Sequence, residues 1–254
     1  MIDGYGPSTY GDRFADVYDA WFGDVSDTRA TVERLAALAA AVAERRPVLE
    51  LGGGSGRLAL PLAERGLATW TVDASLAMVR RLRAKPSGHR VHAVVADMAA
   101  LPLARGPRFS VAVCAFNTLF NLTTTEDQRR CLRDVAARLV PEAGRLVVEA
   151  AVIAEDERHD TAGAVEPRHI GLDEVVLTVS RFDPATGVIC GQHVQLTEGG
   201  IRLRPWVLRY LAPRELDALA AQAGLRLTER HAGWRGEPFT ADSPRHVSTY
   251  APVH

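Results

Sequence analysis

The sequence predicts a doubly wound α/β domain that carries a small inserted antiparallel β meander. Through residue 151, short apolar strand-like segments alternate with segments whose apolar residues recur every three or four positions. This alternation is typical of βαβ units built around a parallel sheet. Beyond residue 151, strand-like segments follow one another through short turns, and short turns between neighbouring strands require antiparallel pairing.

The elements follow in order along the chain. An amphipathic helix over 28–45 ends before Pro47, and a helix over 75–84 begins with Ser75 as its N-cap. The α/β pattern predicts strands at 48–51, 68–72, 91–96, 109–115 and 145–151, and further helices at 55–64 and 125–139. The meander has strands at 174–182, 188–196 and 201–210, and it is followed by a helix over 213–223 and closing strands at 225–231 and 246–251.

These elements divide the chain into three parts, with no linker long enough to separate independent domains. We predict an N-terminal helical segment over residues 1–46 and an inserted antiparallel subdomain over residues 152–211. Residues 47–151 and 212–254 together form the α/β domain.

Composition indicates a soluble globular protein and excludes several kinds of partner. Of the 254 residues, 47% are hydrophobic and 24% are charged, with a formal net charge of -1. No basic cluster is present to neutralise a nucleic-acid backbone, so nucleic acid is not expected as a partner. The sequence lacks an apolar stretch of about 18 residues and an N-terminal signal pattern, which predicts a cytoplasmic protein without a membrane partner.

The segment "VLELGGGSGRLAL" places a glycine loop directly after the first predicted strand. A phosphate-binding P-loop ends in Gly-Lys-Ser/Thr, whereas Arg57 follows Gly56 here. Gly54, Gly56 and Ala59 nominally fit a dinucleotide fingerprint, but the first glycine of such a site follows the strand at once. That frame starts at Gly52 and puts Arg57 where a small residue is needed, which disfavours a dinucleotide.

Three acids follow three successive strands and favour a cationic adenosine derivative. Glu50 stands at the end of the first strand, where it disfavours a pyrophosphate by like-charge repulsion. Asp73 ends the second strand, about twenty residues past the first glycine, where a carboxylate accepts both hydroxyls of a ribose. Asp97 and Met98 follow the third strand, where they suit an adenine amino group and an adenine ring.

Together these features resemble the class I S-adenosylmethionine-dependent methyltransferases. The resemblance covers residues 48–151, including the segment "LVPEAGRLVVEA", and departs from the family only in the turn at 141–144. It implies a seven-stranded Rossmann-like methyltransferase sheet, S-adenosyl-L-methionine as cofactor, S-adenosyl-L-homocysteine as product, and no metal. The implied cofactor-binding residues are Glu50, Gly52, Gly54, Gly56, Asp73, Ala74, Asp97, Met98 and Ala115.

The segment after the fourth strand, "CAFNTLFNL", narrows the subclass. It lacks the Asn/Asp-Pro-Pro-aromatic element of nucleobase methyltransferases and the acidic cluster of metal-dependent catechol-type enzymes. With "YGDRFADVYDAWFG" it resembles the small-molecule methyltransferases of bacterial secondary metabolism, which include aminosugar and lincosamide-type antibiotic N-methyltransferases. This resemblance implies that the N-terminal helices form a lid, that Tyr18 contacts the site, and that the meander covers the acceptor pocket or contacts another subunit.

The favoured hypothesis is N-methylation of a small-molecule amine, such as an antibiotic or aminosugar precursor, by a homo-oligomer. Tyr18 and Asn117 are predicted to orient the acceptor, Phe116 to exclude water, and Tyr10 to join them. The alternatives are that Phe116 is core packing and that Tyr10 and Tyr18 only cap a surface helix.

Other functions stay open at this point. O-methylation requires a base, for which the candidates are His159, His169 and His193. Arg202, Arg204 and Trp206 alternate on one strand face, which fits an anionic substrate or, more simply, a solvated or subunit-contacting face. An NAD(P)-dependent oxidoreductase and a catalytically silent cofactor-binding scaffold are the more distant alternatives.

Overall fold

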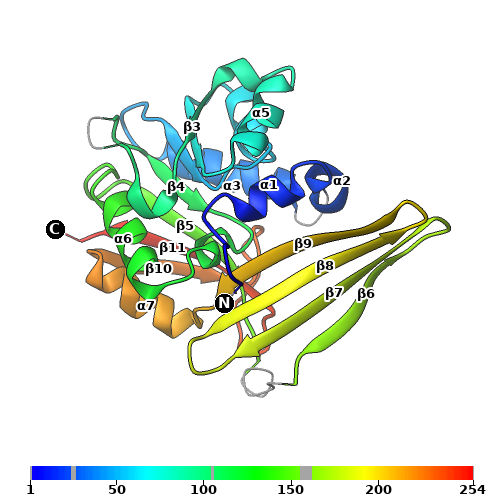
Figure 1. Ribbon diagram of the computed structural model, residues 1–254. Coiled ribbons are helices and arrows are strands. Elements are labelled where there is room, and N and C mark those ends of the chain that lie inside the picture. The colour runs from blue at the N-terminus through cyan, green and yellow to red at the C-terminus, as the bar shows by residue number, and fades with distance from the viewer. Residues whose placement is uncertain (1, 24–26, 104–105, 155–161, 254) are drawn as a thin grey trace.

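The computed structural model describes residues 2–23, 27–103, 106–154 and 162–253 and contains two β-sheets (Figure 1). The larger sheet has seven strands in the order β10-β11-β5-β4-β1-β2-β3. Its strands are β1 Val48–Leu51, β2 Thr69–Asp73, β3 Val91–Val95, β4 Val111–Cys114, β5 Arg145–Ala151, β10 Leu225–His231 and β11 Arg245–Pro252. Strand β11 pairs antiparallel with β5 and β10, and the other pairs in this sheet are parallel. The predicted seven-stranded doubly wound sheet is therefore confirmed.

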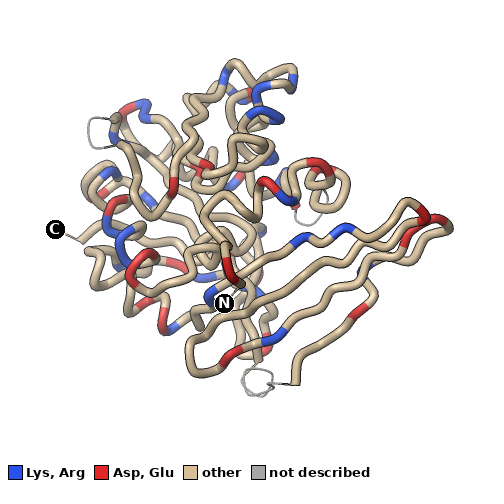
Figure 2. Tube along the Cα trace, viewed as in Figure 1, with Lys and Arg blue, Asp and Glu red and all other residues tan. Residues whose placement is uncertain are grey.

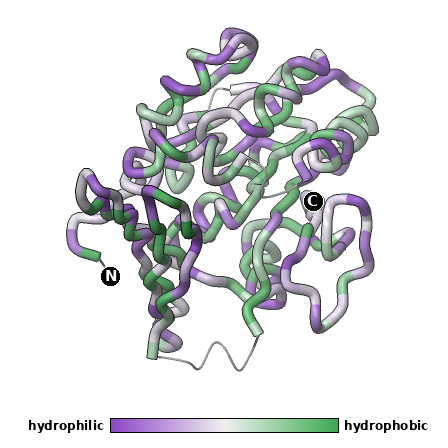
Figure 3. The backbone as a smooth tube through the Cα atoms, turned by 90° about the vertical axis from the view of Figure 1, so that its right-hand side faces the viewer, coloured by the Kyte–Doolittle hydropathy of each residue, from purple (hydrophilic) through white to green (hydrophobic). Residues whose placement is uncertain are grey.

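Helices cover both faces of this sheet and bury its apolar residues. These helices are α3 Thr28–Ala40, α4 Ala59–Glu64, α5 Leu76–Ala84, α6 Thr125–Ala136 and α7 Pro213–Gln222. One core cluster contains apolar residues of α6 and α7, and another contains apolar residues of α3. Every residue of the central strands β1 and β4 is buried, and green, hydrophobic stretches are visible within the tube in Figure 3.

The first residues of α4 and α5 are set by a glycine turn and by an N-cap side chain, respectively. Ser75 caps α5 as expected, since its hydroxyl accepts the Met78 N–H at 3.1 Å. Helix α4 begins at Ala59 rather than at residue 55. Gly54 and Gly56 have φ values of 54° and 90°, which a right-handed helix does not allow, so the turn must finish before α4 starts.

The second sheet is antiparallel and has the order β6-β7-β8-β9. Its strands are β6 Ala164–Ile170, β7 Glu174–Asp183, β8 Val188–Thr197 and β9 Gly200–Arg209. The short N-terminal helices α1 Thr9–Phe14 and α2 Tyr18–Phe22 lie alongside β9, between this sheet and the α/β domain (Figure 1).

The sequence predicted three strands in this sheet, and β6 is the fourth. Every residue of β6 is exposed, and Pro167 interrupts its ladder, so the strand has no apolar alternation to reveal it. An edge strand with one partner and no buried face does not need that alternation.

Acidic and basic residues are interspersed along the described chain (Figure 2). Among the described helices, none is long and apolar enough to cross a bilayer.

Candidate active site

A cavity of about 410 Å³ lies at the carboxyl ends of the parallel strands. Its floor comes from the segments that follow β1 to β4, and its other walls come from the N-terminal helices and the second sheet. Most of the predicted site residues line it: Tyr10, Tyr18, Gly52, Gly54, Asp73, Ala74, Asp97, Met98, Phe116 and Asn117. Glu50, Gly56 and Ala115 do not line it.

The glycine loop is shaped by backbone that other residues rarely adopt. Gly52, Gly54 and Gly56 all have positive φ, at 61°, 54° and 90°. Glycine occupies this region freely because it has no Cβ. At Gly53 a Cβ would collide with the Thr71 hydroxyl, so the loop also passes close to β2. These positions let the main chain pass close to a ligand in the cavity.

Asp73 ends β2 and connects the glycine loop to α5. Its Oδ2 accepts the Gly54 N–H and its Oδ1 accepts the Ser75 N–H, each at 2.8 Å. Burial raises the pKa of this carboxyl, and the two backbone bonds oppose that rise. Each carboxylate oxygen keeps a second lone pair, so the group is fixed in place and still able to accept ligand hydroxyls.

Asp97 and Met98 stand side by side in the chain at the next strand end, and both line the cavity. Asp97 caps a 3₁₀ turn over Met98–Ala100, because its Oδ1 accepts the Ala99 N–H at 2.8 Å. The arrangement presents a carboxylate and a thioether side chain together at the cavity.

Glu50 is buried, 5% exposed, next to the glycine loop. Burial raises its pKa to about 8, while the Arg57 charge and the Ala59 N–H oppose the rise. Its Oε2 has no hydrogen-bond partner. A positive charge nearby would favour the ionised form of this carboxyl, whose pKa is raised by burial.

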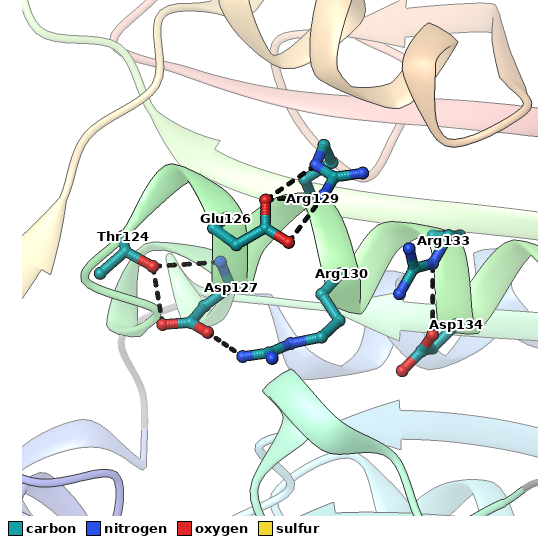
Figure 4. Close-up of polar contacts among 7 residues, drawn as sticks. All are labelled: Thr124, Glu126, Asp127, Arg129, Arg130, Arg133 and Asp134. Atoms are coloured by element: carbon teal, nitrogen blue, oxygen red, sulfur yellow. Dashed lines mark hydrogen bonds and ion pairs between the residues drawn. The ribbon is translucent and has the colours of Figure 1, made fainter.

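The cavity lining lacks the basic groups that a phosphate would need. Among the described lining residues there is no Lys or Arg. Asp127 also lines the cavity, but its carboxylate is already engaged by Thr124 and Arg130 (Figure 4). Within the described ranges, no three His, Cys, Asp or Glu side chains come together as a metal site would require. The donor set fits a cationic nucleoside better than a dinucleotide.

Phe116 and Asn117 follow β4 and both have left-handed backbone, with φ of 50° and 60°. The Phe116 N–H donates to the Glu149 carboxylate at 2.9 Å, and Asn117 Oδ1 accepts the Ala151 N–H at 2.7 Å. The side-chain oxygen of Asn117 is therefore already hydrogen-bonded within the protein, so only its Nδ2 group is left to contact a methyl-acceptor molecule. Sequence reasoning missed Glu149, whose signal was an acid within the apolar strand "RLVVEAA".

The N-terminal helices contribute an aromatic wall. Tyr10 stacks on Phe14 at a centroid distance of 4.5 Å, and the Tyr18 and Phe22 rings lie 5.1 Å apart. Tyr10 and Tyr18 line the cavity, so they do more than cap a surface helix. Burial raises the pKa of Tyr18 to about 12 and holds the pKa of Tyr10 well above its ordinary value, so both hydroxyls stay protonated at neutral pH.

Ion pairs join these helices to both neighbouring layers. Asp19 accepts hydrogen bonds from Ser55 in the glycine loop, from Lys85 at 3.0 Å and from Arg81 at 3.2 Å. On the other side, Asp16 pairs with Arg204 at 2.6 Å and with Arg202 at 2.7 Å.

The two β9 arginines differ: Arg202 is solvent-exposed, as one alternative predicted, whereas Arg204 is buried, and both pair with Asp16 of the N-terminal segment. Arg204 is 2% exposed, and its guanidinium lies over the Trp21 ring as well as beside Asp16. Trp206, from the same strand, lines the cavity.

The three candidate histidines differ in their position relative to the cavity. His193 lines the cavity, and its Nδ1 lies 3.0 Å from the Thr178 hydroxyl. Burial lowers the pKa of His193 to about 4, with the Arg168 and Arg204 charges adding to the effect. His169 lies on the exposed strand β6, away from the cavity lining, and His159 falls outside the described residues.

Comparisons with known proteins agree with this geometry. A family model described as a methyltransferase domain matches residues 48–142. The structure of the CcbJ methyltransferase from Streptomyces caelestis is 41% identical, covers 98% of this chain and 100% of that chain, and superposes with a TM-score of 0.90.

Two further relatives cover most of both chains. The cypemycin N-terminal methyltransferase of a Streptomyces species is 28% identical over 244 residues, which is 93% of this chain and 95% of the relative. CalS10, a S-adenosylmethionine-bound amino pentose methyltransferase from Micromonospora echinaspora, shares the fold at 23% identity and a TM-score of 0.65, covering 92% of this chain and 96% of that one. The glycine loop, the strand-end acids and the similarity over the whole chain place this protein among the S-adenosylmethionine-dependent methyltransferases of bacterial secondary metabolism.

Proposed function

We propose that the protein transfers a methyl group from S-adenosylmethionine to an amine of a small-molecule acceptor, such as an antibiotic or aminosugar precursor. The observation that carries the choice of an amine is the absence of an effective base among the described residues on the acceptor side of the cavity. That side is formed by aromatic residues and by His193.

The cofactor's place follows from the strand-end acids. Asp73 would accept the ribose hydroxyls, Asp97 and Met98 would hold the adenine, and the glycine loop would approach the amino-acid end, with Glu50 beneath it. Ala74, Gly56 and Ala115 would shape the surrounding backbone. When bound, the cofactor supplies an electrophilic methyl group on a sulfonium.

The acceptor side of the cavity would orient the methyl acceptor and shield it from water. Phe116 and Tyr18 place aromatic surface there, and the hydroxyls of Tyr10 and Tyr18 remain protonated donors. The Nδ2 of Asn117 is left as a donor because its oxygen is bonded to Ala151. Such groups align a lone pair for in-line displacement and keep water out, which is most of what this reaction needs from a protein.

An alcohol acceptor needs a general base to remove its proton, whereas a neutral amine does not. A general base works best when its pKa lies near the working pH, and the pKa of His193 is lowered to about 4. The tyrosines hold their protons too tightly to act as bases. A neutral amine needs no base before transfer, because its nitrogen lone pair attacks directly and the proton leaves to solvent afterwards. O-methylation with His193 as base is the second candidate, since of the two candidate histidines that the structure describes only His193 lines the cavity.

The names of two similar proteins support the choice of an amine acceptor. The cypemycin enzyme is an N-terminal methyltransferase and CalS10 acts on an amino pentose. Both acceptors named there carry an amino group.

A paired acceptor panel tests the proposal. Purified protein would be incubated with methyl-labelled S-adenosylmethionine and with aminosugars, short peptides with free N-termini, and the matching hydroxyl analogues. We expect label transfer to amines and none to the hydroxyl analogues. Transfer only to hydroxyl compounds, together with a thousand-fold or larger loss of turnover in His193→Gln at unchanged S-adenosylhomocysteine affinity, would establish O-methylation instead. Calorimetric binding of NAD(P)H without S-adenosylhomocysteine binding would contradict both.

Homo-oligomerisation in the cytoplasm is part of the same proposal. The second sheet exposes large apolar side chains, including Val165, Ile170, Leu172, Ile201 and Leu203. An exposed apolar sheet with an open edge strand is suited to bury itself against another copy. Light scattering on the purified protein tests this, and a monomeric mass at micromolar concentration would contradict it.

A further inference from the structure

We propose that Glu149 is a positioning residue for methyl transfer, because its carboxylate holds Phe116 in the left-handed conformation that sets the aromatic wall of the cavity. The kinetic consequence rests on the proposed function, whereas the restraint itself does not. Glu149 belongs to β5, is 4% exposed, and does not line the cavity.

The segment after β4 needs an external restraint. Phe116 and Asn117 are consecutive residues with positive φ. Asparagine tolerates this region, but a bulky residue such as phenylalanine is rarely found there. Conformations of this kind persist only where the surrounding structure imposes them, and they concentrate at functional sites.

All three hydrogen bonds that hold the segment in place come from β5. The Phe116 N–H donates to Glu149 Oε2 at 2.9 Å, and the Asn117 N–H donates to the Glu149 carbonyl at 3.1 Å. The third joins the Ala151 N–H to Asn117 Oδ1 at 2.7 Å. Strand β5 is paired on both sides, with β4 and β11, so it is a rigid support.

The Glu149 bond is the one that acts on Phe116 directly. It joins a carboxylate to a backbone N–H, a pairing stronger than one between neutral groups. The Phe116 ring lies 6.0 Å from the Phe22 ring of the N-terminal helices, centroid to centroid, and lines the cavity. A shift of the Phe116 backbone would therefore move the ring against the lid and the reacting groups, and misplacement by about 1 Å lowers a rate by up to a hundredfold.

Variants of Glu149 that change the side-chain length or the charge distinguish a positioning role from a general effect on stability. Glu149→Gln keeps the chain length and an acceptor oxygen, whereas Glu149→Asp keeps the charge but withdraws it from the Phe116 N–H. Glu149→Leu removes the acceptor altogether. We expect Glu149→Gln to keep kcat within about threefold, and Asp and Leu to lower kcat about tenfold or more. Acceptor KM and S-adenosylhomocysteine affinity should stay within about threefold in all three.

Amide exchange at Phe116, followed by NMR, supplies a measurement that needs no acceptor. We expect protection in the wild type and in Glu149→Gln, and fast exchange in Glu149→Asp, which should fold even where Glu149→Leu does not. Equal protection of the Phe116 amide in the wild type and Glu149→Asp would overturn the proposal. So would unchanged kcat in Glu149→Asp, or a loss in Glu149→Gln as large as in Glu149→Asp. Methylation of alcohols by the wild type would contradict the proposed amine acceptor while leaving these comparisons intact.

Discussion

The Lys85 ammonium donates to Asp19 Oδ1 at 3.0 Å and to the Ser55 carbonyl at 2.9 Å, and so joins helix α2 to the glycine loop. Lys85 is the only lysine in the chain. Burial alone would raise the pKa of Asp19, but the hydrogen bonds from Ser55 and Lys85 outweigh it and lower the pKa overall. The carboxylate therefore stays ionised at neutral pH, and Lys85 holds the N-terminal helices against the cofactor site.

Removing this contact should loosen the packing of α2 on the glycine loop. In Lys85→Met we expect S-adenosylhomocysteine to bind about fivefold more weakly, through faster dissociation, because a partly exposed ion pair contributes up to about 1 kcal/mol. Stopped-flow dissociation and calorimetry measure both quantities. Arg83→Met is the control, since Arg83 donates to the Ala93 carbonyl rather than to α2 or the glycine loop in the part of the chain that the structure describes. Equal dissociation rates in the two variants would contradict the assignment.

The strand-end acids should differ sharply in their effect on cofactor binding. Asp73→Asn places an amide against two N–H donors and removes the acceptor proposed for the ribose, so affinity for S-adenosylhomocysteine should fall about a hundredfold, or roughly 3 kcal/mol. Asp127→Asn is the matched control, because Asp127 lines the same cavity but is held by Thr124 and Arg130. We expect less than a threefold change there. Comparable losses in both variants would count against the cofactor role of Asp73.

Asp16 should matter to folding more than its exposure suggests. The Arg204 hydrogen bond lowers the pKa of Asp16, and Arg204 itself is buried. In Asp16→Ala a buried guanidinium loses its carboxylate, which we expect to lower the free energy of unfolding by about 2 kcal/mol. Arg202→Ala removes only an exposed partner and should change it by less than about 1 kcal/mol. Urea unfolding compares the two, and equal effects would show that burial of Arg204 is unimportant.

His246 should make the protein less stable in mild acid. It is fully buried on β11, and burial, with the Arg230 charge, lowers its pKa to about 4. Because the folded pKa lies below the unfolded value of about 6.5, His246 has no effect above pH 6.5. Below that pH the unfolded chain gains the proton first, so stability is lost as the pH falls from 6.5 toward 4, by up to roughly 1.4 kcal/mol per unit.

The raised pKa of Glu50 acts with the opposite sign between pH 8 and 4.5, so the wild-type curve alone is not diagnostic. The difference between the wild type and His246→Gln isolates the histidine. We expect the unfolding free energy of the variant to fall less than that of the wild type between pH 7 and pH 5.5. Parallel curves for the two proteins would contradict the prediction.

The sequence predicted that these strand-end residues meet at one cavity because parallel strands fix where their ends lie. Asp73, Asp97 and the glycines each follow a strand of one sheet, so their spacing along the chain determines their proximity in space. Glu50 follows the same rule but lies next to the loop rather than in the cavity wall.

What the sequence did not reveal depends on contacts between distant segments. Asp19 meets Lys85 and Glu149 meets Phe116 only after the layers pack, and no periodicity marks either pair. The same holds for Arg204. Its place in the alternating pattern of β9 was visible in the sequence, but its partner Asp16 was not. Strand β6 stayed hidden because none of its residues is buried.

The cavity walls have separate origins in the chain. The residues proposed for the cofactor come from the large sheet, whereas His193, Trp206 and Leu208 reach the cavity from β8 and β9. Engineering can therefore treat the two as independent modules. Substitutions at these inward positions of β8 and β9 should redirect the enzyme to new acceptors while the same methyl donor is used.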